Sequence, residues 1–298
     1  MTTDISIIIV NYNTKDLLRG CINSIVSHTQ DIDYEVIVVD NASSDGSVEM
    51  LKNDFPDVRL IESGGNLGFG RANNLGIERA TGKYLFLLNS DTLLVNNAVK
   101  AFFDRARTLE AAGIRLGVLG AILKGRDLTP CHSYGRFITP ASELRELAAK
   151  YLRFLKDRSN LHPKPVDSDL RVDYVTGADM FLPRSVFEAT GGFDPDFFMY
   201  CEEVDWQKRM QEAGLERMII DGPEIIHLEG GSNPSKSSIW SPGRLRNLYR
   251  SRAIYRRKHF PRSILGPFNL LRRLIDIPAI LLTAIMLKRK EYLQLIKL

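Results

Sequence analysis

The run from Tyr84 to Leu88 constrains the fold of this chain more than any other stretch. Its residues are all apolar or aromatic, and Asn89, Ser90 and Asp91 follow directly. A short apolar run bounded by polar residues predicts a strand that is buried on both faces. A carboxylate at its end lies at the carboxyl edge of the sheet, where open α/β sheets bind ligands. Asp91 is therefore a candidate ligand for a divalent metal on a diphosphate, or else a cap for the helix predicted from Asn96.

Strand and helix patterns alternate on both sides of this run. Further strands are predicted at Ser6 to Val10, Tyr34 to Val39, Val58 to Ile61 and Leu116 to Ile122. Helices are predicted at Lys15 to His28, Arg71 to Ala80 and Asn96 to about Leu109. This alternation predicts an α/β fold with a mostly parallel sheet that helices cover on both faces.

The alternation is interrupted after the strand that ends at Ile122. Residues 124–170 have a mixed pattern with one charged helical piece near Ser142 to Lys156, and we interpret them as a variable insertion. Strands are predicted again at Val172 to Thr176, Gly177 to Leu182 and Arg217 to Ile220. We therefore predict one α/β domain over residues 1–242, which contains the insertion, and a separate tail over residues 243–298.

Three of the predicted strands end in polar residues. The first strand runs into Asn11 and Asn13, the second into Asp40, and the central one into Asn89, Ser90 and Asp91. In a parallel sheet these ends lie on one edge and can line one crevice. Asp40 could accept a hydrogen bond from a base N–H, since a carboxylate accepts and does not donate. Each cluster alone is more typical of a turn or cap, but the three together indicate a binding site.

A glycine-rich stretch after the third strand weakly resembles a phosphate loop. It contains Asn66 and Gly68, and Asn73 follows in the next helix. The glycines do not have the GxGxxG order, and no GxxxxGK[ST] motif occurs, which argues against a dinucleotide-binding dehydrogenase and a P-loop ATPase. A turn at a helix start is the alternative interpretation of this stretch.

Two further candidates come later in the chain. Glu202 and Glu203 open a predicted helix, where one carboxylate could act as a general base, although acids also favour helix starts because of the macrodipole. His227 is predicted in a polar loop that continues to Ser232. A lone histidine is usually structural, and His227 becomes a candidate because a metal at Asp91 would need a second protein ligand.

The charge is distributed unevenly along the chain. Residues 243–298 contain fourteen Lys and Arg against two acids, so the tail carries +12 and the rest of the chain −8. A basic tail rich in apolar residues predicts helices that lie on an anionic membrane surface. Its longest uncharged run, Ile277 to Leu287, is too short to span a bilayer. No module for stacking bases or reading a groove accompanies the charge, so nucleic acid is not expected as a partner.

A specific family resemblance rests on seven segments. They are Val10 to Asn13, Val38 to Ser47, Asn66 to Phe69, Ala72 to Asn74, Leu88 to Asp91, Gly191 to Asp194 and Glu202 to Asp205. Together they resemble glycosyltransferase family 2, and within it the bacterial rhamnosyltransferase branch. The resemblance runs from about Ile5 to Ser232 and leaves the tail uncovered.

The resemblance implies a GT-A fold, a nucleotide-sugar donor, a divalent metal (Mg²⁺ or Mn²⁺) and inversion at the anomeric carbon. By position it assigns the base-binding role to Asp40, the DxD motif to Asn89, Ser90 and Asp91, and the late metal-binding histidine to His227. Gly177 and Ala178 join the expected nucleotide-sugar-binding residues. The DxD position begins with Asn89, which leaves Asp91 as its metal ligand.

The same resemblance suggests the reaction and its location. The Glu-Asp base motif of the family is Glu202-Glu203 here, with Glu203 as the expected base and Glu202 as the alternative. The expected donor is dTDP-L-rhamnose, and the expected acceptor is a polyprenyl-diphosphate-linked saccharide at the cytoplasmic face of the inner membrane. The widely spaced Cys21, Cys131 and Cys201 fit a reducing compartment.

Two other functions remain open from the sequence. A sugar-nucleotide pyrophosphorylase would need a Gly-rich loop bearing Arg or Lys after the first strand, and Asn11 to Asn13 at that place disfavour it. A non-catalytic sugar-binding or scaffold protein with a vestigial site would be compatible with the departures at Asn89 and Glu203.

Overall fold

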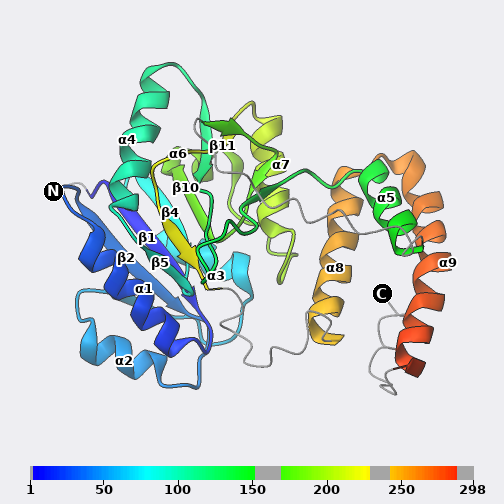
Figure 1. Ribbon diagram of the computed structural model, residues 1–298, viewed down its shortest axis with the longest axis horizontal. Helices are drawn as coiled ribbons and strands as arrows, with labels where there is room; N and C mark the ends of the chain where they lie inside the picture. The colour runs from blue at the N-terminus through cyan, green and yellow to red at the C-terminus, as the bar shows by residue number, and fades with distance from the viewer. Residues whose placement is uncertain (1–2, 152–168, 229–241, 287–298) are drawn as a thin grey trace. The chain divides into compact units, whose positions relative to one another are not determined.

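The computed structural model describes residues 3–151, 169–228 and 242–286 (Figure 1). Among these residues, an eight-stranded sheet forms the centre of the first of two units. Its strands are, in spatial order, β3 (Arg59–Glu62), β2 (Tyr34–Asp40), β1 (Ile5–Asn11), β4 (Tyr84–Asn89), β10 (Asp179–Pro183), β6 (Leu116–Gly120), β11 (Glu216–Ile219) and β8 (Leu170–Arg171). β1 is parallel to β2 and β4, and β2 is parallel to β3. The mostly parallel sheet that the sequence predicts is confirmed.

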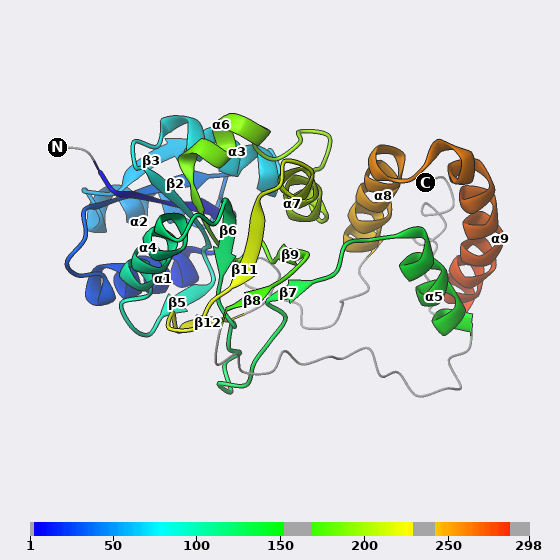
Figure 2. The ribbon, with the colours of Figure 1, turned by 90° about the horizontal axis from the view of Figure 1, so that it is seen from above.

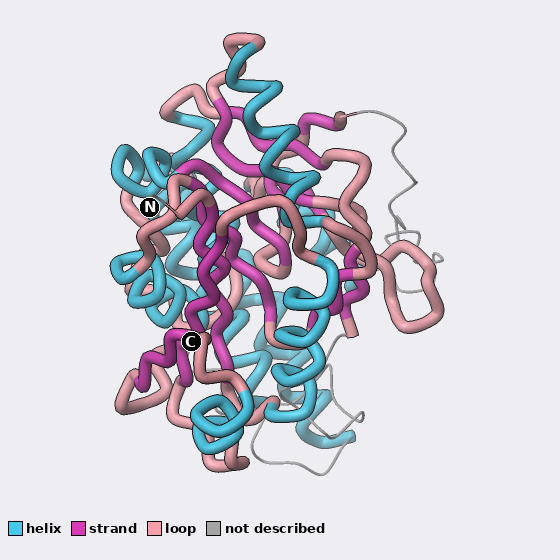
Figure 3. The backbone as a smooth tube through the Cα atoms, turned by 90° about the vertical axis from the view of Figure 1, so that its left-hand side faces the viewer, coloured by secondary structure: helices cyan, strands magenta, loops and turns pink. Residues whose placement is uncertain are grey.

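Helices cover both faces of this sheet, as Figures 2 and 3 show. One face packs against α1 (Lys15–His28), α2 (Ser47–Asp54) and α4 (Ala98–Ala111). The other packs against α3 (Phe69–Arg79), α6 (Arg184–Thr190) and α7 (Glu202–Glu212). The apolar run in β4 explains this arrangement: Tyr84, Phe86 and Leu88 point into the first core, and Leu85 and Leu87 into the second. A strand buried on both faces has no polar position until it ends.

Strand β10 departs from the parallel pattern. It lies between β4 and β6 and is antiparallel to both. Asp179, the first residue of β10, is therefore paired with Leu88, near the end of β4. The apolar pattern of β10 indicates burial but carries no information about strand direction, which the pairing alone decides.

Two short pairs of strands accompany the large sheet. β5 (Thr92–Leu94) pairs with β12 (Ile225–His227), and β7 (Tyr134–Gly135) pairs with β9 (Tyr174–Val175). The prediction that His227 lies in a loop is wrong, because His227 ends β12 opposite Thr92. Three residues are too few to produce a recognisable period, so only backbone pairing reveals this strand. Residues 229–232 of the predicted loop lie outside the described residues.

The described part of the second unit consists mainly of α5 (Pro140–Tyr151), α8 (Pro242–His259) and α9 (Arg262–Met286). α5 comes from the predicted insertion, whereas α8 and α9 belong to the predicted tail. Part of each predicted region, residues 152–168 of the insertion and 287–298 of the tail, lies outside the described residues. Of the described helices, none is both long enough and apolar enough to cross a bilayer.

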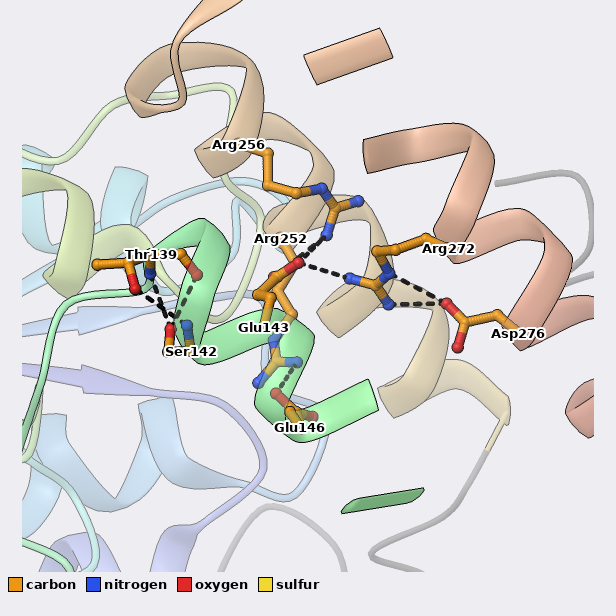
Figure 4. Close-up of polar contacts among 8 residues, drawn as sticks. All are labelled: Thr139, Ser142, Glu143, Glu146, Arg252, Arg256, Arg272 and Asp276. Atoms are coloured by element: carbon orange, nitrogen blue, oxygen red, sulfur yellow. Dashed lines mark hydrogen bonds and ion pairs between the residues drawn. The ribbon is translucent and has the colours of Figure 1, made fainter. Parts of the chain in front are cut away.

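A buried carboxylate connects these three helices (Figure 4). Glu143 of α5 is 2% exposed and accepts hydrogen bonds from Arg256 of α8, at 3.2 and 3.3 Å, and from Arg272 of α9, at 3.1 Å. Arg272 also donates to Asp276 at 2.8 Å. Both arginines are buried, so Glu143 neutralises charge that water does not reach. The insertion and the tail thus contribute to one helical unit.

Replacing Glu143 by alanine should destabilise the helical unit strongly. Arg256 and Arg272 would stay buried without this anion, which costs about 3–5 kcal/mol for a broken buried pair. The matched control is Glu146→Ala, because Glu146 pairs with Arg252 at 2.7 Å but its side chain is 41% exposed. A pair of that kind contributes about 1 kcal/mol or less. Urea unfolding followed by circular dichroism measures both variants, and equal losses would contradict the role of Glu143.

Candidate active site

The parallel register brings the predicted polar strand ends together. Asn11 is paired with Asp40 across β1 and β2, and Val10 is paired with Asn89 across β1 and β4. The hydroxyls of Thr14 and Ser90 lie 2.9 Å apart and share a hydrogen bond beyond the strand ends. The three clusters therefore form one edge of the sheet, as the sequence predicts.

Asp40 is held rigidly at this edge. Asn11 Nδ2 donates to Asp40 Oδ2 at 2.8 Å, and the Ser43 backbone N–H donates to Asp40 Oδ1 at 2.9 Å. The Asp40 residue is only 2% exposed. Each carboxylate oxygen can accept a second hydrogen bond, so an oriented Asp40 keeps the capacity to receive a ligand N–H.

The loops after β1 and β2 are joined by the side chain of Asn13. Its Oδ1 accepts the Ser44 N–H at 2.8 Å, and its own N–H donates to Ser43 Oγ at 3.0 Å. Asn13 has a positive φ of 53°, a backbone conformation that asparagine tolerates better than most residues. These contacts make the two loops one surface rather than two independent turns.

The sequence places Asn41 at the polar end of the second strand, next to Asp40, but assigns it no role. Its side chain accepts the Leu67 N–H at 2.8 Å and donates to Asn66 Oδ1 and the Gly68 carbonyl, both at 3.2 Å. It thereby attaches the glycine-rich loop to the end of β2. The signal was its place directly after Asp40, but these three contacts are with residues 25 to 27 positions away in the chain, and no local pattern reports them.

The glycine-rich loop is shaped by contacts within the protein. Gly68 has a φ of 82°, and a Cβ there would lie 2.1 Å from the carbonyl oxygen of Phe198. The close approach that requires a glycine is thus to Phe198. Asn73 is buried in α3 and donates to the Phe69 carbonyl at 3.1 Å, a contact within its own helix.

The start of β10 connects the end of β4 to the predicted catalytic helix. The Asn89 N–H donates to the Ala178 carbonyl at 3.0 Å. A Cβ on the neighbouring Gly177 would lie 3.9 Å from Glu203 Cβ. Gly177 and Ala178 therefore lie between the acidic end of β4 and the first turn of α7.

The first turn of α7 contains the candidate base. Glu202 is 4% exposed, whereas Glu203 is only half-buried. Burial raises the pKa of Glu203 above its ordinary value, although the backbone N–H groups of Glu203 and Val204 act in the opposite direction. A carboxylate with a raised pKa is the stronger base, which suits proton abstraction from a hydroxyl.

The structure brings Asp91 and His227 together. The antiparallel pairing of β5 with β12 places His227 Nε2 3.3 Å from Asp91 Oδ1, and both side chains are about 15% exposed. Burial by itself lowers the pKa of His227, but its interactions with Asp91 and Cys131 outweigh this effect and raise the pKa to about 10. The imidazole is thus protonated at neutral pH while it faces the carboxylate.

This pair fits a divalent metal. A carboxylate is an ordinary ligand for Mn²⁺ or Mg²⁺, and the imidazole Nε2 of His227 lies on the same side as the Asp91 carboxylate, where it could add a nitrogen ligand. No group of three or more His, Cys, Asp or Glu able to hold a metal occurs among the described residues. Asp91 and His227 would therefore need oxygen ligands from a bound diphosphate or water to complete the coordination.

Comparisons with known proteins show which proteins this chain resembles. The family model described as Glycosyl transferase family 2 matches residues 6–165. The chain is 25% identical over 240 residues to the N-acetylglucosaminyl-diphospho-decaprenol L-rhamnosyltransferase of Mycobacterium tuberculosis, covering 76% of each chain. It is 24% identical over 236 residues to Rhamnosyltransferase WbbL of Escherichia coli, covering 77% of this chain and 85% of that protein.

The fold matches a solved structure as well. The crystal structure of GalNAc-T7 with UDP, GalNAc and Mn²⁺ superimposes with a TM-score of 0.54 at 15% sequence identity. The match covers 83% of this chain and about half, 48%, of that longer chain. The fold is that of a GT-A glycosyltransferase. The chain belongs to glycosyl transferase family 2, and it is a glycosyltransferase rather than a pyrophosphorylase or a scaffold.

Metal binding should release about one proton from the site. His227 is protonated below its pKa of about 10, and a nitrogen that holds a proton cannot bind a metal. At pH 7 the metal must displace this proton, so the affinity should rise by about tenfold per pH unit on the acid side of the pKa. Titration calorimetry with Mn²⁺ in buffers of different ionisation enthalpy counts the protons. In the control variant His227→Gln the release should disappear, and an unchanged count would exclude His227 as a ligand.

Proposed function

We propose that this glycosyltransferase moves L-rhamnose from dTDP-L-rhamnose onto a lipid-linked, polyprenyl-diphosphate saccharide, with inversion at the anomeric carbon. The observation that carries the proposal is that Asp40, the Asp91–His227 pair and Glu203, which lies near Gly177, are found along one edge of the sheet. Asp40 suits the nucleotide and the Asp91–His227 pair suits a metal-bound diphosphate. Glu203 suits the role of catalytic base. The names of the two rhamnosyltransferase relatives support the donor sugar and the lipid-linked acceptor.

The proposed site binds the donor from its nucleotide end. Asp40, fixed by Asn11 and Ser43, accepts a hydrogen bond from the pyrimidine N–H. The Asn66 and Gly68 loop and the end of β4 line the path toward the sugar. Asp91 and His227 would hold a divalent metal, which supplies charge stabilisation for the departing nucleoside diphosphate.

Glu203 is the proposed base. It takes the proton from the acceptor hydroxyl while that oxygen forms a bond to the anomeric carbon. The bond from this carbon to the diphosphate breaks on the opposite side, so the configuration inverts and dTDP leaves with the electron pair. Glu203 is favoured over Glu202 because it is less buried and lies beside Gly177.

The tail is proposed to attach the enzyme to an anionic membrane at the cytoplasmic face. Leu270, Leu271 and Leu274 of α9 are 62%, 41% and 65% exposed, and Arg273 beside them is exposed too. An exposed leucine face with a basic flank suits the headgroup region of an anionic leaflet. The buried Arg256 and Arg272 do not contribute, since both are paired with Glu143. Attachment would bring the enzyme to its lipid-linked acceptor.

Replacing Glu203 by glutamine should abolish turnover without weakening donor binding. Loss of the base should lower kcat by about 10²–10⁴-fold, because the acceptor hydroxyl would keep its proton at the moment of attack. Glu202→Gln is the matched control, one residue away and with a much smaller expected loss. Release of dTDP in the presence of a polyprenyl-diphosphate acceptor gives kcat, and calorimetry gives donor affinity. Equal and small losses would show that neither residue is the base.

The same assay tests the substrates independently of the base. Wild-type enzyme should transfer rhamnose from dTDP-L-rhamnose to the lipid-linked acceptor. Transfer from a different nucleotide-sugar alone would contradict the proposed donor while leaving the transferase assignment intact.

Membrane binding should depend on the exposed leucines of α9. The double variant Leu270→Ser, Leu274→Ser should bind phosphatidylglycerol-containing vesicles about tenfold more weakly, given the apolar surface it removes. Val26→Ser is the control, because Val26 is 60% exposed on α1 of the first unit. Flotation with and without phosphatidylglycerol, at low and high salt, measures the partition. Point variants are preferable to truncation, which would leave Glu143 buried without Arg256 and Arg272. Equal flotation of all three proteins would exclude this surface.

A further inference from the structure

The chain leaves the sheet unit after Phe198, belongs to the helical unit from Met199 to Cys201, and returns to the sheet unit at Glu202. By their contacts these three residues belong with α8 and α9, whereas Phe198 before them and Glu202 after them belong with the sheet. The next residue in the chain after Glu202 is Glu203, the proposed base. The segment is joined directly to the first residue of α7.

The backbone of this segment is strained. Tyr200 has a φ of 73° and Cys201 a φ of 65°, and neither is a glycine. The left-handed region is unfavourable for such residues, and two in succession are maintained only when neighbouring contacts hold them. The segment has no regular secondary structure of its own, so the holding contacts must come from its surroundings.

Contacts on both sides supply this restraint. Before the segment, the Phe198 carbonyl accepts a hydrogen bond from the Phe69 N–H at 3.1 Å. The same carbonyl lies against Gly68, where a side chain would collide with it. Within the segment, the Met199 carbonyl accepts a hydrogen bond of 2.8 Å from Ser251 Oγ of α8. Ser251 is 2% exposed, so its hydroxyl has no competing water. After the segment, Asp205 accepts from Arg209 at 3.1 Å, within the first turns of α7.

We propose that Ser251 is a positioning residue for the base: by holding the Met199 carbonyl, it keeps Tyr200 and Cys201 in their strained conformation and so fixes the first turn of α7. This role rests on the proposed function of Glu203. It gives the C-terminal helices a part in catalysis in addition to membrane attachment. The hydroxyl does not touch the substrate in this scheme and acts only through the backbone of the segment.

A double-mutant cycle tests the role. Ser251→Ala should lower kcat about tenfold while the dTDP dissociation constant stays within about twofold of wild type, because the nucleotide contacts are elsewhere. In a Glu203→Gln background the same substitution should have no further effect, since the base on which it acts is already absent. Ser251→Thr, which retains the hydroxyl, should restore most of the turnover. Arg250→Ala, an exposed neighbour on α8, is the control and should behave as wild type.

Hydrogen exchange provides a readout that does not depend on activity. In Ser251→Ala the amides of residues 199–204 should exchange faster, while those of β1 and β4 should not change. Unchanged kcat and exchange in an active, folded variant would overturn the role of Ser251. An equal loss of kcat in the wild-type and Glu203→Gln backgrounds would also overturn it. Inactive wild-type enzyme would instead contradict the proposed function.

Discussion

The parallel pairing of β1 with β2 and β4 is the constraint on which the rest of this structure depends. It places Asn11 opposite Asp40 and brings Asn89 to the same edge, so that polar side chains from distant parts of the chain reach hydrogen-bonding distance. Because β4 is apolar on both faces, its polar residues can occur only where it leaves the sheet. The candidate binding edge of this family 2 glycosyltransferase is therefore a consequence of how its core is buried.

Two antiparallel pairings complete the site. β10 runs against β4, so it begins where β4 ends and brings Gly177 and Ala178 beside Asn89. β12 is antiparallel to β5, so His227 is paired with Thr92, the residue that follows Asp91. A β10 parallel to β4 would have started at the opposite edge of the sheet, and a β12 parallel to β5 would have placed its last residue, His227, away from Thr92. The change of direction is thus what lets late segments meet the early ones at one place.

The basic residues of the tail differ in burial within the helical unit. Arg256 and Arg272 are buried against Glu143, where geometry and desolvation make each charge necessary to the others. Arg273 stays exposed beside the leucines of α9, where charge can act on a surface. The net charge of the tail therefore overstates the number of basic side chains that could contact a membrane. The short segment before Glu202 links this unit to the candidate base through the chain itself.

The sequence by itself determined the strand and helix order, the apolar centre of the sheet and the polar residues at its edge, because local periodicity and strand ends report burial directly. It also pointed to Asp91 and His227 as partners, through the family resemblance. Only the tertiary structure decided the direction of β10, the strand that contains His227 and the contacts of Asn41, Glu143 and Ser251. Each of these depends on hydrogen bonds between residues far apart in the chain, and such pairings leave no trace in a local pattern.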